Sequence, residues 1–175
     1  EMPAASSRAK NRKVKYFIVT FDDANTSVFT KAYPFLKAKG IPFIIFITKG
    51  LVGKPNFLTE DQIKTLAADP LCTVGSHGIN HVMFRYLAPE AAAAEYRASR
   101  IYLEELTGTT VDCFAFPYGR VVECSRKNID VLKHSEYDFG FSAIAGNLGQ
   151  QWLSGKYYLS RVNVDEGMVG KVIND

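Results

Sequence analysis

A nearly continuous apolar run, from Pro42 to Ile47, limits the folds open to this chain. A strand with water on one face alternates apolar and polar residues, whereas this run carries apolar side chains that face both ways. Such a strand is typical of a parallel sheet with both faces covered. Parallel strands need long crossover connections, so the rest of the chain should alternate between strands and helices.

The residue pattern shows this alternation. Strands are predicted at 14–21, 42–47, 72–75, 111–116, 137–142 and 157–164, and helices at 28–39, 59–68, 89–106 and 125–134. Gly40 and Gly108 follow two of these helices as C-terminal stops, and Pro89 stands in the first turn of the longest. The alternation predicts a parallel α/β arrangement, either open or barrel-like.

Composition restricts the class of protein. The chain has 175 residues, of which 47% are hydrophobic, so we expect one globular domain over residues 14–175. Residues 1–13 are expected to be a disordered or linker tail. A net charge of +3 argues against a dedicated nucleic-acid binder, and no apolar segment is long enough for membrane insertion. Because the chain begins at Glu1, we expect a processed chain or a piece of a longer one. Three cysteines without Cys-x-x-Cys spacing do not suggest a zinc ribbon or a disulfide framework.

Two neighbouring carboxylates, Asp22 and Asp23, end the first predicted strand. In α/β proteins, ligands bind just beyond the carboxyl ends of strands. Two adjacent acids at such a place repel each other unless a cation or a proton lies between them. The pattern therefore indicates a cation site, with a solvated turn after the strand as the alternative.

His77 and His81 follow the third predicted strand, four residues apart. At this spacing both imidazoles would fall on one face of a helical turn and could converge on one ion. A His-x-x-x-His pair alone is a weak signal, and a hydrogen-bonded pair is the alternative. A carboxylate from another strand end would complete two nitrogen ligands and one oxygen ligand, a common catalytic zinc set with an open position for water.

The segment Phe116-Pro117-Tyr118-Gly119 ends the fourth predicted strand. Proline fixes such a turn and glycine permits it, so backbone N–H groups lie at its rim. An N–H group placed there can donate to a developing oxyanion. By itself the segment is also compatible with an ordinary turn.

Taken together, three segments resemble the motifs of the polysaccharide deacetylase family, the NodB-homology domain of carbohydrate esterase family 4. They are Thr20-Phe21-Asp22-Asp23, Ser76-His77-Gly78-Ile79-Asn80-His81 and Phe114-Ala115-Phe116-Pro117-Tyr118-Gly119, the last in the Phe-Ala-x-Pro-Tyr-Gly form of a subgroup. In order and spacing the resemblance covers about residues 15–165. It implies a distorted (β/α) barrel with about six or seven parallel strands. It also implies metal-dependent hydrolytic de-N-acetylation of a surface polysaccharide or oligosaccharide by a periplasmic or secreted enzyme.

The resemblance also implies roles for individual residues. Asp23, His77 and His81 would bind one divalent metal, which we expect to be zinc. Asp22 would be the general base that takes a proton from the attacking water. The backbone N–H of Tyr118 would help to hold the oxyanion.

Two positions depart from the family pattern. An arginine that many members carry two residues before the third-motif proline is replaced by Ala115, so another residue, Arg161 or Arg120, would have to orient Asp22. The late Leu-x-His motif, which supplies a general acid, reads Leu159-Ser160-Arg161 here. Arginine cannot shuttle protons near neutral pH, so Arg161 is expected to pair with Asp22 or to stabilise charge on the intermediate. The remaining histidine, His134, is expected on the surface.

Aromatic side chains could stack on the sugar, and the candidates are Trp152, Tyr118 and Phe84. Two rival functions stay open. One is a catalytically weak or silent carbohydrate-binding domain of the same fold. The other is a carbon–nitrogen hydrolase that acts on a small cyclic amide, which would need a small closed site, whereas a polysaccharide would need an open groove.

Overall fold

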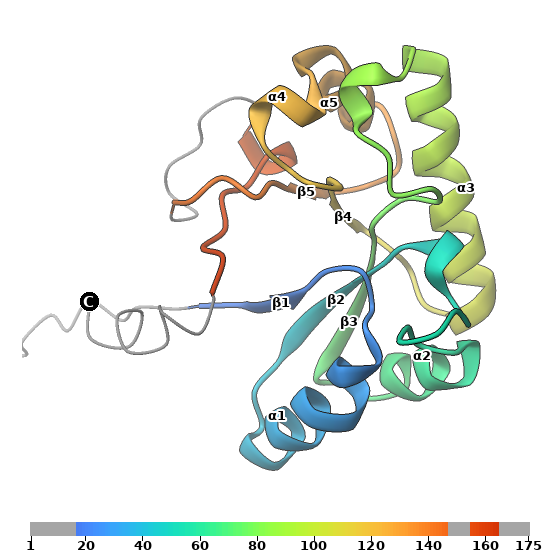
Figure 1. The fold of residues 1–175 in the computed structure, drawn as a ribbon, viewed down its shortest axis with the longest axis vertical. Coiled ribbons are helices and arrows are strands. Elements are labelled where there is room, and N and C mark those ends of the chain that lie inside the picture. Colours follow the sequence, from blue (N-terminus) through green and yellow to red (C-terminus); the bar gives the residue numbers. More distant parts are fainter. Residues whose placement is uncertain (1–16, 147–154, 165–175) are drawn as a thin grey trace, which may run out of the picture.

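The computed structural model describes residues 17–146 and 155–164, and within these ranges five parallel strands form one sheet in the order β1-β2-β3-β4-β5 (Figure 1). The strands are β1 (Val19–Phe21), β2 (Phe43–Ile47), β3 (Cys72–Ser76), β4 (Cys113–Ala115) and β5 (Phe139–Phe141). The α-helices are α1 (Tyr33–Lys39), α2 (Glu60–Ala67), α3 (Pro89–Thr107), α4 (Val121–Cys124) and α5 (Arg126–Lys133). The other helical segments are a π-helix, η1 (Val28–Ala32), and three 3₁₀ turns, η2 (Lys49–Leu51), η3 (Phe84–Tyr86) and η4 (Gly155–Tyr157).

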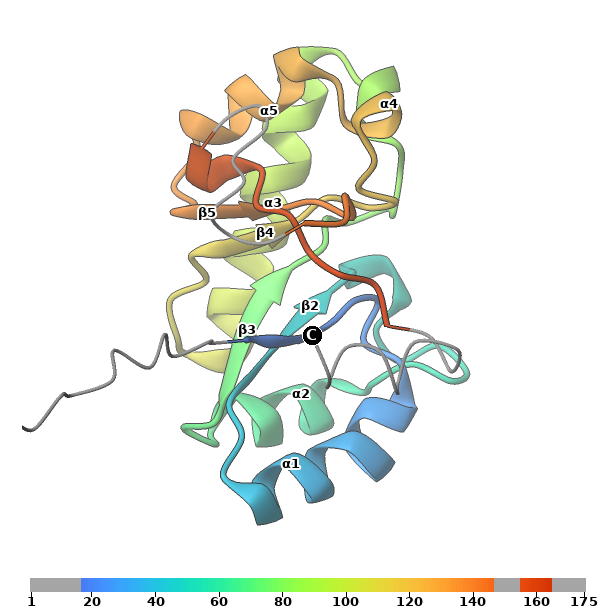
Figure 2. The same ribbon diagram turned by 90° about the vertical axis from the view of Figure 1, so that its left-hand side faces the viewer.

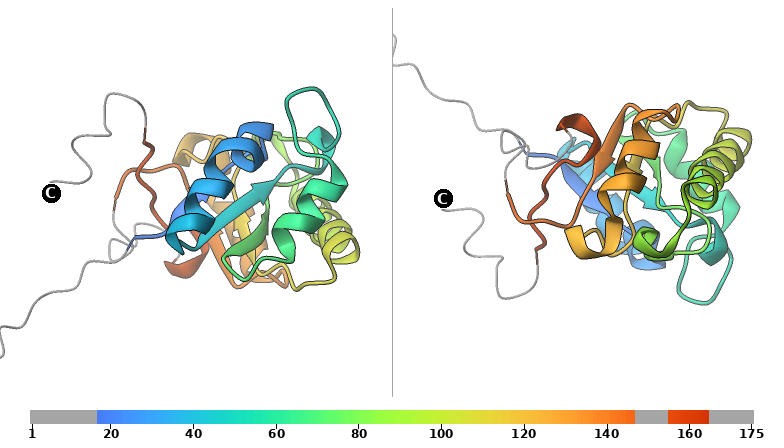
Figure 3. Two further views of the ribbon diagram at one scale, coloured as in Figure 1. Left: turned by 90° about the horizontal axis from the view of Figure 1, so that it is seen from below. Right: turned by 90° about the horizontal axis from the view of Figure 1, so that it is seen from above.

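The sheet curls into a half-barrel, and the helices lie on its outer side (Figures 1 and 2). The view from below shows α1 and α2 in front of the strands, with α3 beyond α2 (Figure 3). The α/β barrel-like class is therefore confirmed. No helix among the described residues is both long and apolar enough to cross a membrane.

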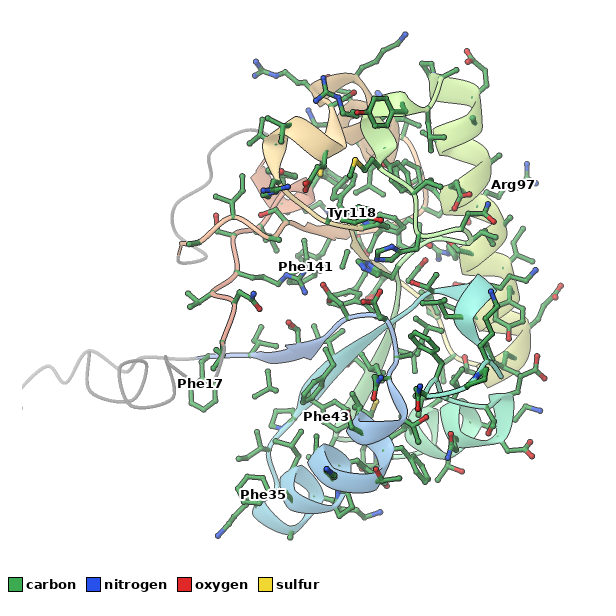
Figure 4. All side chains as sticks on the ribbon, in the orientation of Figure 1. Phe17, Phe35, Phe43, Arg97, Tyr118 and Phe141 are labelled. Atoms are coloured by element: carbon green, nitrogen blue, oxygen red, sulfur yellow. The ribbon has the colours of Figure 1, made fainter. Side chains whose placement is uncertain are left out.

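Strand alternation divides the apolar residues into two cores, because successive side chains point to opposite faces. Toward the helices the sheet contributes Phe43, Ile45, Ile47, Val74 and Phe114 to the larger core. A smaller core inside the curl contains Ile44, Phe46, Cys113, Ala115 and Phe141, with Leu159 packed against it. Side-chain sticks agree with this division: Phe35 and Arg97 reach outward from α1 and α3, and Phe43 lies between α1 and the sheet (Figure 4).

The same alternation positions the site. Val19 and Phe21 of β1 pack against the larger core, so the alternating residues Thr20 and Asp22 face the inside of the curl. On β3, Val74 belongs to the larger core, so His77, three residues later, also faces the inside of the curl. The sequence thus brings polar side chains to the inner side of the curl at the carboxyl ends of β1 and β3.

The predicted strand at 157–164 is wrong, and the sheet has five strands in the described residues instead of six or seven. Gly155–Tyr157 forms a 3₁₀ turn, and Leu159 makes only an isolated parallel bridge with Phe141. The segment that follows β5 bends just after Phe141, so the strand pairing with Leu159 does not continue. The Arg161 N–H still donates to the Ile144 carbonyl. The predicted tail at 1–13 lies outside the described residues, and β1 begins at Val19 where a strand was predicted from residue 14.

Gly140 of β5 is where the last described segment packs closest to the sheet. A Cβ atom at this position would lie 2.7 Å from Leu132 Cδ2 and 2.8 Å from the carbonyl carbon of Tyr157. Overpacking of this kind costs about 1–3 kcal/mol. We therefore expect Gly140→Ala to lower the free energy of unfolding by about that amount in a urea titration. A free energy of unfolding equal to that of the wild type would contradict this close packing.

Candidate metal centre and active site

Segments that follow β1, β3, β4 and β5 line one cavity of about 470 Å³. Asp22 and Asp23 follow β1, His77 follows β3, and Tyr118 follows β4. Tyr118 lies near the middle of the molecule in Figure 4. The other lining residues are Thr20, His81, Ala143, Arg161, Val162 and Asn163. All six site residues predicted from the sequence therefore lie around one cavity.

Asp23, His77 and His81 each direct one ligand atom to a common point, and these atoms lie within 4.8 Å of one another. Asp23 Oδ1 is 3.0 Å from His81 Nε2 and 3.5 Å from His77 Nε2. The same Oδ1 atom is buried and has no hydrogen-bond partner among the described residues. A buried carboxylate oxygen without a donor is costly unless a cation compensates it.

A hydrogen bond to the Ala115 carbonyl fixes the tautomer of His77. His77 Nδ1 lies 2.7 Å from the Ala115 carbonyl oxygen, which can only accept, so Nδ1 carries the hydrogen. Burial lowers the pKa of His77, so the ring is neutral and Nε2 presents a lone pair to Asp23. Two acceptors face each other at 3.5 Å, an arrangement that suits a shared cation. The hydrogen bond at Nδ1 also orients the ring, as outer partners of metal-binding histidines do.

Charge and stacking act on the second histidine. The close approach of the Asp23 carboxylate, 3.0 Å from His81 Nε2, is the main cause that raises the pKa of His81, and the same contact is the main cause that lowers the pKa of Asp23. The Tyr118 ring packs on His81, with ring centroids 4.8 Å apart. In the described part of the chain, no backbone carbonyl accepts from the Tyr118 N–H, so this donor is available to a ligand.

Asp22 is held by Arg161 through two hydrogen bonds. Arg161 Nη1 donates to Asp22 Oδ1 at 2.7 Å, and Nη2 donates to Asp22 Oδ2 at 2.8 Å. Arg161 Nε donates to the Ser142 carbonyl at 2.7 Å, and Nη1 also donates to Thr20 Oγ1 at 3.2 Å. One guanidinium therefore fixes both oxygens of Asp22 and joins β1 to the residue after β5. The alternative orienting residue, Arg120, pairs with Glu123 instead.

Some expectations for this region are wrong. Residues 77–81 form a loop, where a helical turn was expected, because Gly78 and His81 have φ of 79° and 51°. Phe84 is 1% exposed in the larger core and stacks on Tyr96, so it cannot serve as a sugar platform. Trp152 lies outside the described residues. His134 is exposed, as expected.

Backbone strain gathers at the site. Asp23, His81 and Tyr118 have φ of 66°, 51° and 62°, a region that non-glycine residues rarely adopt. Each such residue costs on the order of 1–3 kcal/mol and persists only where its surroundings fix it. The strain therefore indicates that the fold holds these three residues in place against their local preference.

Sequence reasoning missed Glu95. It lies on the buried face of α3 with Ala92, Tyr96, Ser99 and Leu103, and it accepts hydrogen bonds from the backbone of the 77–81 loop. The available signal was an acid at the helical spacing of otherwise apolar or small residues. Ser142 was also missed, because it acts through its carbonyl group, which any residue could supply.

Known proteins resemble this chain in sequence. A family model described as polysaccharide deacetylase matches residues 9–140, so Arg161 lies beyond the matched region. The Bacillus subtilis protein YxkH is 29% identical over 161 residues, which is 92% of this chain and 56% of YxkH. The poly-beta-1,6-N-acetyl-D-glucosamine N-deacetylase of Staphylococcus aureus is 25% identical over 165 residues, which covers 85% of this chain and 54% of that protein. The chain thus spans about half the length of these curated relatives.

Solved structures share the fold. IcaB from Ammonifex degensii superposes with a TM-score of 0.73 at 26% identity, covering 89% of this chain and 70% of IcaB. The Streptococcus pyogenes deacetylase PplD, solved in complex with acetate, gives a TM-score of 0.75 at 22% identity, covering 86% of this chain and 65% of PplD. The second likeness supports the fold alone. With three-quarters of the chain matched by one family model, this chain belongs to the polysaccharide deacetylase family.

Proposed function

We propose that this chain hydrolytically removes acetyl groups from N-acetylated sugars of a surface polysaccharide, with one divalent metal that we expect to be zinc. The observation that carries the proposal is the convergence of Asp23, His77 and His81 within 4.8 Å, beside a second carboxylate held by Arg161. The name of the Staphylococcus aureus relative suggests poly-β-1,6-N-acetyl-D-glucosamine as the first substrate to test. A substrate of this kind would place the protein in the periplasm or outside the cell.

Solvent access favours a polymer over a small cyclic amide. The Asp23 side chain is 42% exposed and Tyr118 is 48% exposed, so the ligand cluster lies at an accessible surface. A sugar unit within a long chain can reach such a site without being enclosed. A hydrolase for a small cyclic amide would be expected to bury most of its substrate.

Asp23, His77 and His81 would hold the metal and leave positions open for water and substrate. A divalent cation bound there would lower the pKa of its water to about 7 and would polarise the acetyl carbonyl. Asp22 would then act as the general base, with its two oxygens oriented by Arg161. Asp22 takes one proton as the water oxygen bonds to the acetyl carbon. The Tyr118 N–H would donate to the resulting oxyanion, an interaction worth roughly 3–4 kcal/mol when well placed.

The departing nitrogen needs a proton when the carbon–nitrogen bond breaks. Arg161 cannot give it near neutral pH, because the guanidinium does not deprotonate in proteins. Asp22 received the proton of the attacking water and lies beside the same cavity, so it would return that proton to the nitrogen. The products are acetate and a free amine on the sugar. One carboxylate would therefore act first as base and then as acid.

A direct test incubates the protein with poly-β-1,6-N-acetyl-D-glucosamine oligomers and with chitooligosaccharides, and measures acetate and free amines. We expect acetate release that stops with a chelator and returns when zinc is added. Binding of sugar without any release would support a silent carbohydrate-binding domain instead. Release that persists after complete metal removal would contradict the proposed chemistry.

Arg161 provides a second test. In Arg161→Lys the charge remains but the two-pronged contact with Asp22 is lost, and in Arg161→His the side chain is also too short for that contact. Misplacement of a catalytic group by about 1 Å can cost on the order of 10²-fold, so we expect kcat to fall by that order in both variants with zinc affinity unchanged. Arg120→Lys, which alters the pair with Glu123, is the matched control. Faster turnover in Arg161→His would show that a histidine acid belongs at this position.

A further inference from the structure

The loop that carries both histidines is held by the carboxylate of Glu95. Glu95 Oε2 accepts from the Ile79 N–H at 2.7 Å and from the Asn80 N–H at 3.3 Å. Glu95 Oε1 accepts from Asn80 Nδ2. A side chain in the second turn of α3 therefore satisfies three donors of a segment that has no helix or strand ladder of its own.

The opposite side of the loop is also held. The Gly78 and Ile79 carbonyls accept from the N–H groups of Lys49 and Gly50, at 3.0 Å and 2.8 Å. A Cβ atom at Gly50 would lie 2.6 Å from the Ile79 oxygen, so the backbones meet at close range. The segment between the two histidines is thus clamped between η2 and α3, with Glu95 on the α3 side.

The Glu95 carboxylate is buried and depends on the loop for its hydrogen bonds. Glu95 is 9% exposed, and a buried carboxylate is costly unless it is well hydrogen-bonded. In the described residues the hydrogen bonds of the Glu95 carboxylate are all with Ile79 and Asn80, so the carboxylate and the loop stabilise each other. His81 has a left-handed backbone conformation, which a non-glycine residue keeps only where its surroundings hold it.

We propose that Glu95 is a positioning residue for the metal centre: it fixes the 77–81 loop so that His81 meets His77 and Asp23. The inference rests on the proposed function, because it assigns Glu95 to the same site. Outer partners of metal ligands typically contribute 10–100-fold to metal affinity. Glu95→Gln puts an amide opposite the Asn80 amide, and we expect it to weaken zinc binding by about 10–100-fold.

An exchange of partners makes the test specific. Asn80→Asp alone places two carboxylates together, whereas Glu95→Gln combined with Asn80→Asp restores one donor and one acceptor with the total charge unchanged. We expect each single variant to bind zinc more weakly and the double variant to recover to within a few-fold of wild type. Glu105→Gln, an exposed acid on the same helix, is the matched control and should bind zinc as the wild type does.

Zinc affinity is measured by competition with a chromophoric chelator. Amide hydrogen exchange of Ile79 and Asn80, measured without metal, and the visible spectrum of the cobalt-substituted protein report loop order and ligand geometry. The inference predicts faster exchange and an altered spectrum in both single variants, with recovery in the double variant. Should Glu95→Gln fail to fold by circular dichroism, Asn80→Asp and the double variant carry the same comparison.

The outcomes separate the two claims. Tight zinc binding by the wild type together with unchanged affinity, exchange and spectrum in the single variants overturns the role of Glu95 and leaves the proposed function standing. Weakened binding that the double variant does not restore also overturns it, because the loss would then not depend on this pairing. A wild-type protein that binds no zinc refutes the proposed function, and the positioning role with it.

Discussion

Replacing Asp22 by asparagine is expected to lower kcat for acetate release by about 10²–10⁴-fold, the contribution typical of general acid–base catalysis. The amide keeps the size of the side chain but cannot take up the proton of the attacking water. In the proposed mechanism the same group also protonates the departing nitrogen, so both proton transfers are lost together. Steady-state assays of acetate release at saturating zinc measure the effect.

Zinc binding separates this effect from damage to the metal centre. Asp22 is held by Arg161 and is not one of the three converging ligands, so Asp22→Asn should bind one zinc with nearly wild-type affinity. Asp138→Asn, an exposed acid paired with Lys156, is the matched control and should retain full activity. If Asp22→Asn kept most of the wild-type turnover, another group would have to be the base.

Replacing Asp23 by asparagine is expected to separate stability from metal binding. In the metal-free protein, Asp23 Oδ1 faces the lone pair of His77 Nε2 at 3.5 Å, an unfavourable approach of two acceptors. An asparagine amide at that position can donate to Nε2. We therefore expect metal-free Asp23→Asn to unfold at the same temperature as metal-free wild type, or at a higher one. We expect its zinc affinity to fall by more than about 10²-fold, which is a larger loss than removal of an outer-shell partner of a metal ligand typically causes.

Calorimetry with and without zinc tests both halves of this prediction. Wild type should gain thermal stability with added zinc, because a ligand that binds only the folded state stabilises it. Asp23→Asn should gain little at the same zinc concentration. A variant that is strongly destabilised without metal would show that Asp23 serves the fold through its contact with His81, and that its carboxylate is not held in place for a cation.

Local pattern was enough to predict most of the fold. The near-continuous apolarity of residues 42–47 predicted a buried parallel strand, and β2 is buried along its whole length. The residues of 157–164 gave no reason to reject a strand there. No strand forms because the segment that would pair with it bends just after Phe141. Whether a strand forms depends on both of the segments that would pair, so the residue pattern of one segment does not determine it.

The site was predictable where chemistry follows a strand end. Asp22, Asp23 and His77 come directly after β1 and β3, so their meeting follows from parallel topology. The path from His77 to His81 was not predictable, because it depends on left-handed φ at Gly78 and His81 and on donors that reach Glu95. The contact between Arg161 and Asp22 spans 139 residues, and only the resemblance to a family suggested it.

The most direct measurement is a zinc titration of the purified wild type beside Asp23→Asn, followed by X-ray absorption at the zinc edge of the loaded protein. We expect one equivalent of zinc in the wild type, with two imidazole nitrogens and a carboxylate oxygen among its ligands, and a much weaker site in the variant. No bound zinc, a sulfur ligand, or equal binding by both proteins would contradict it.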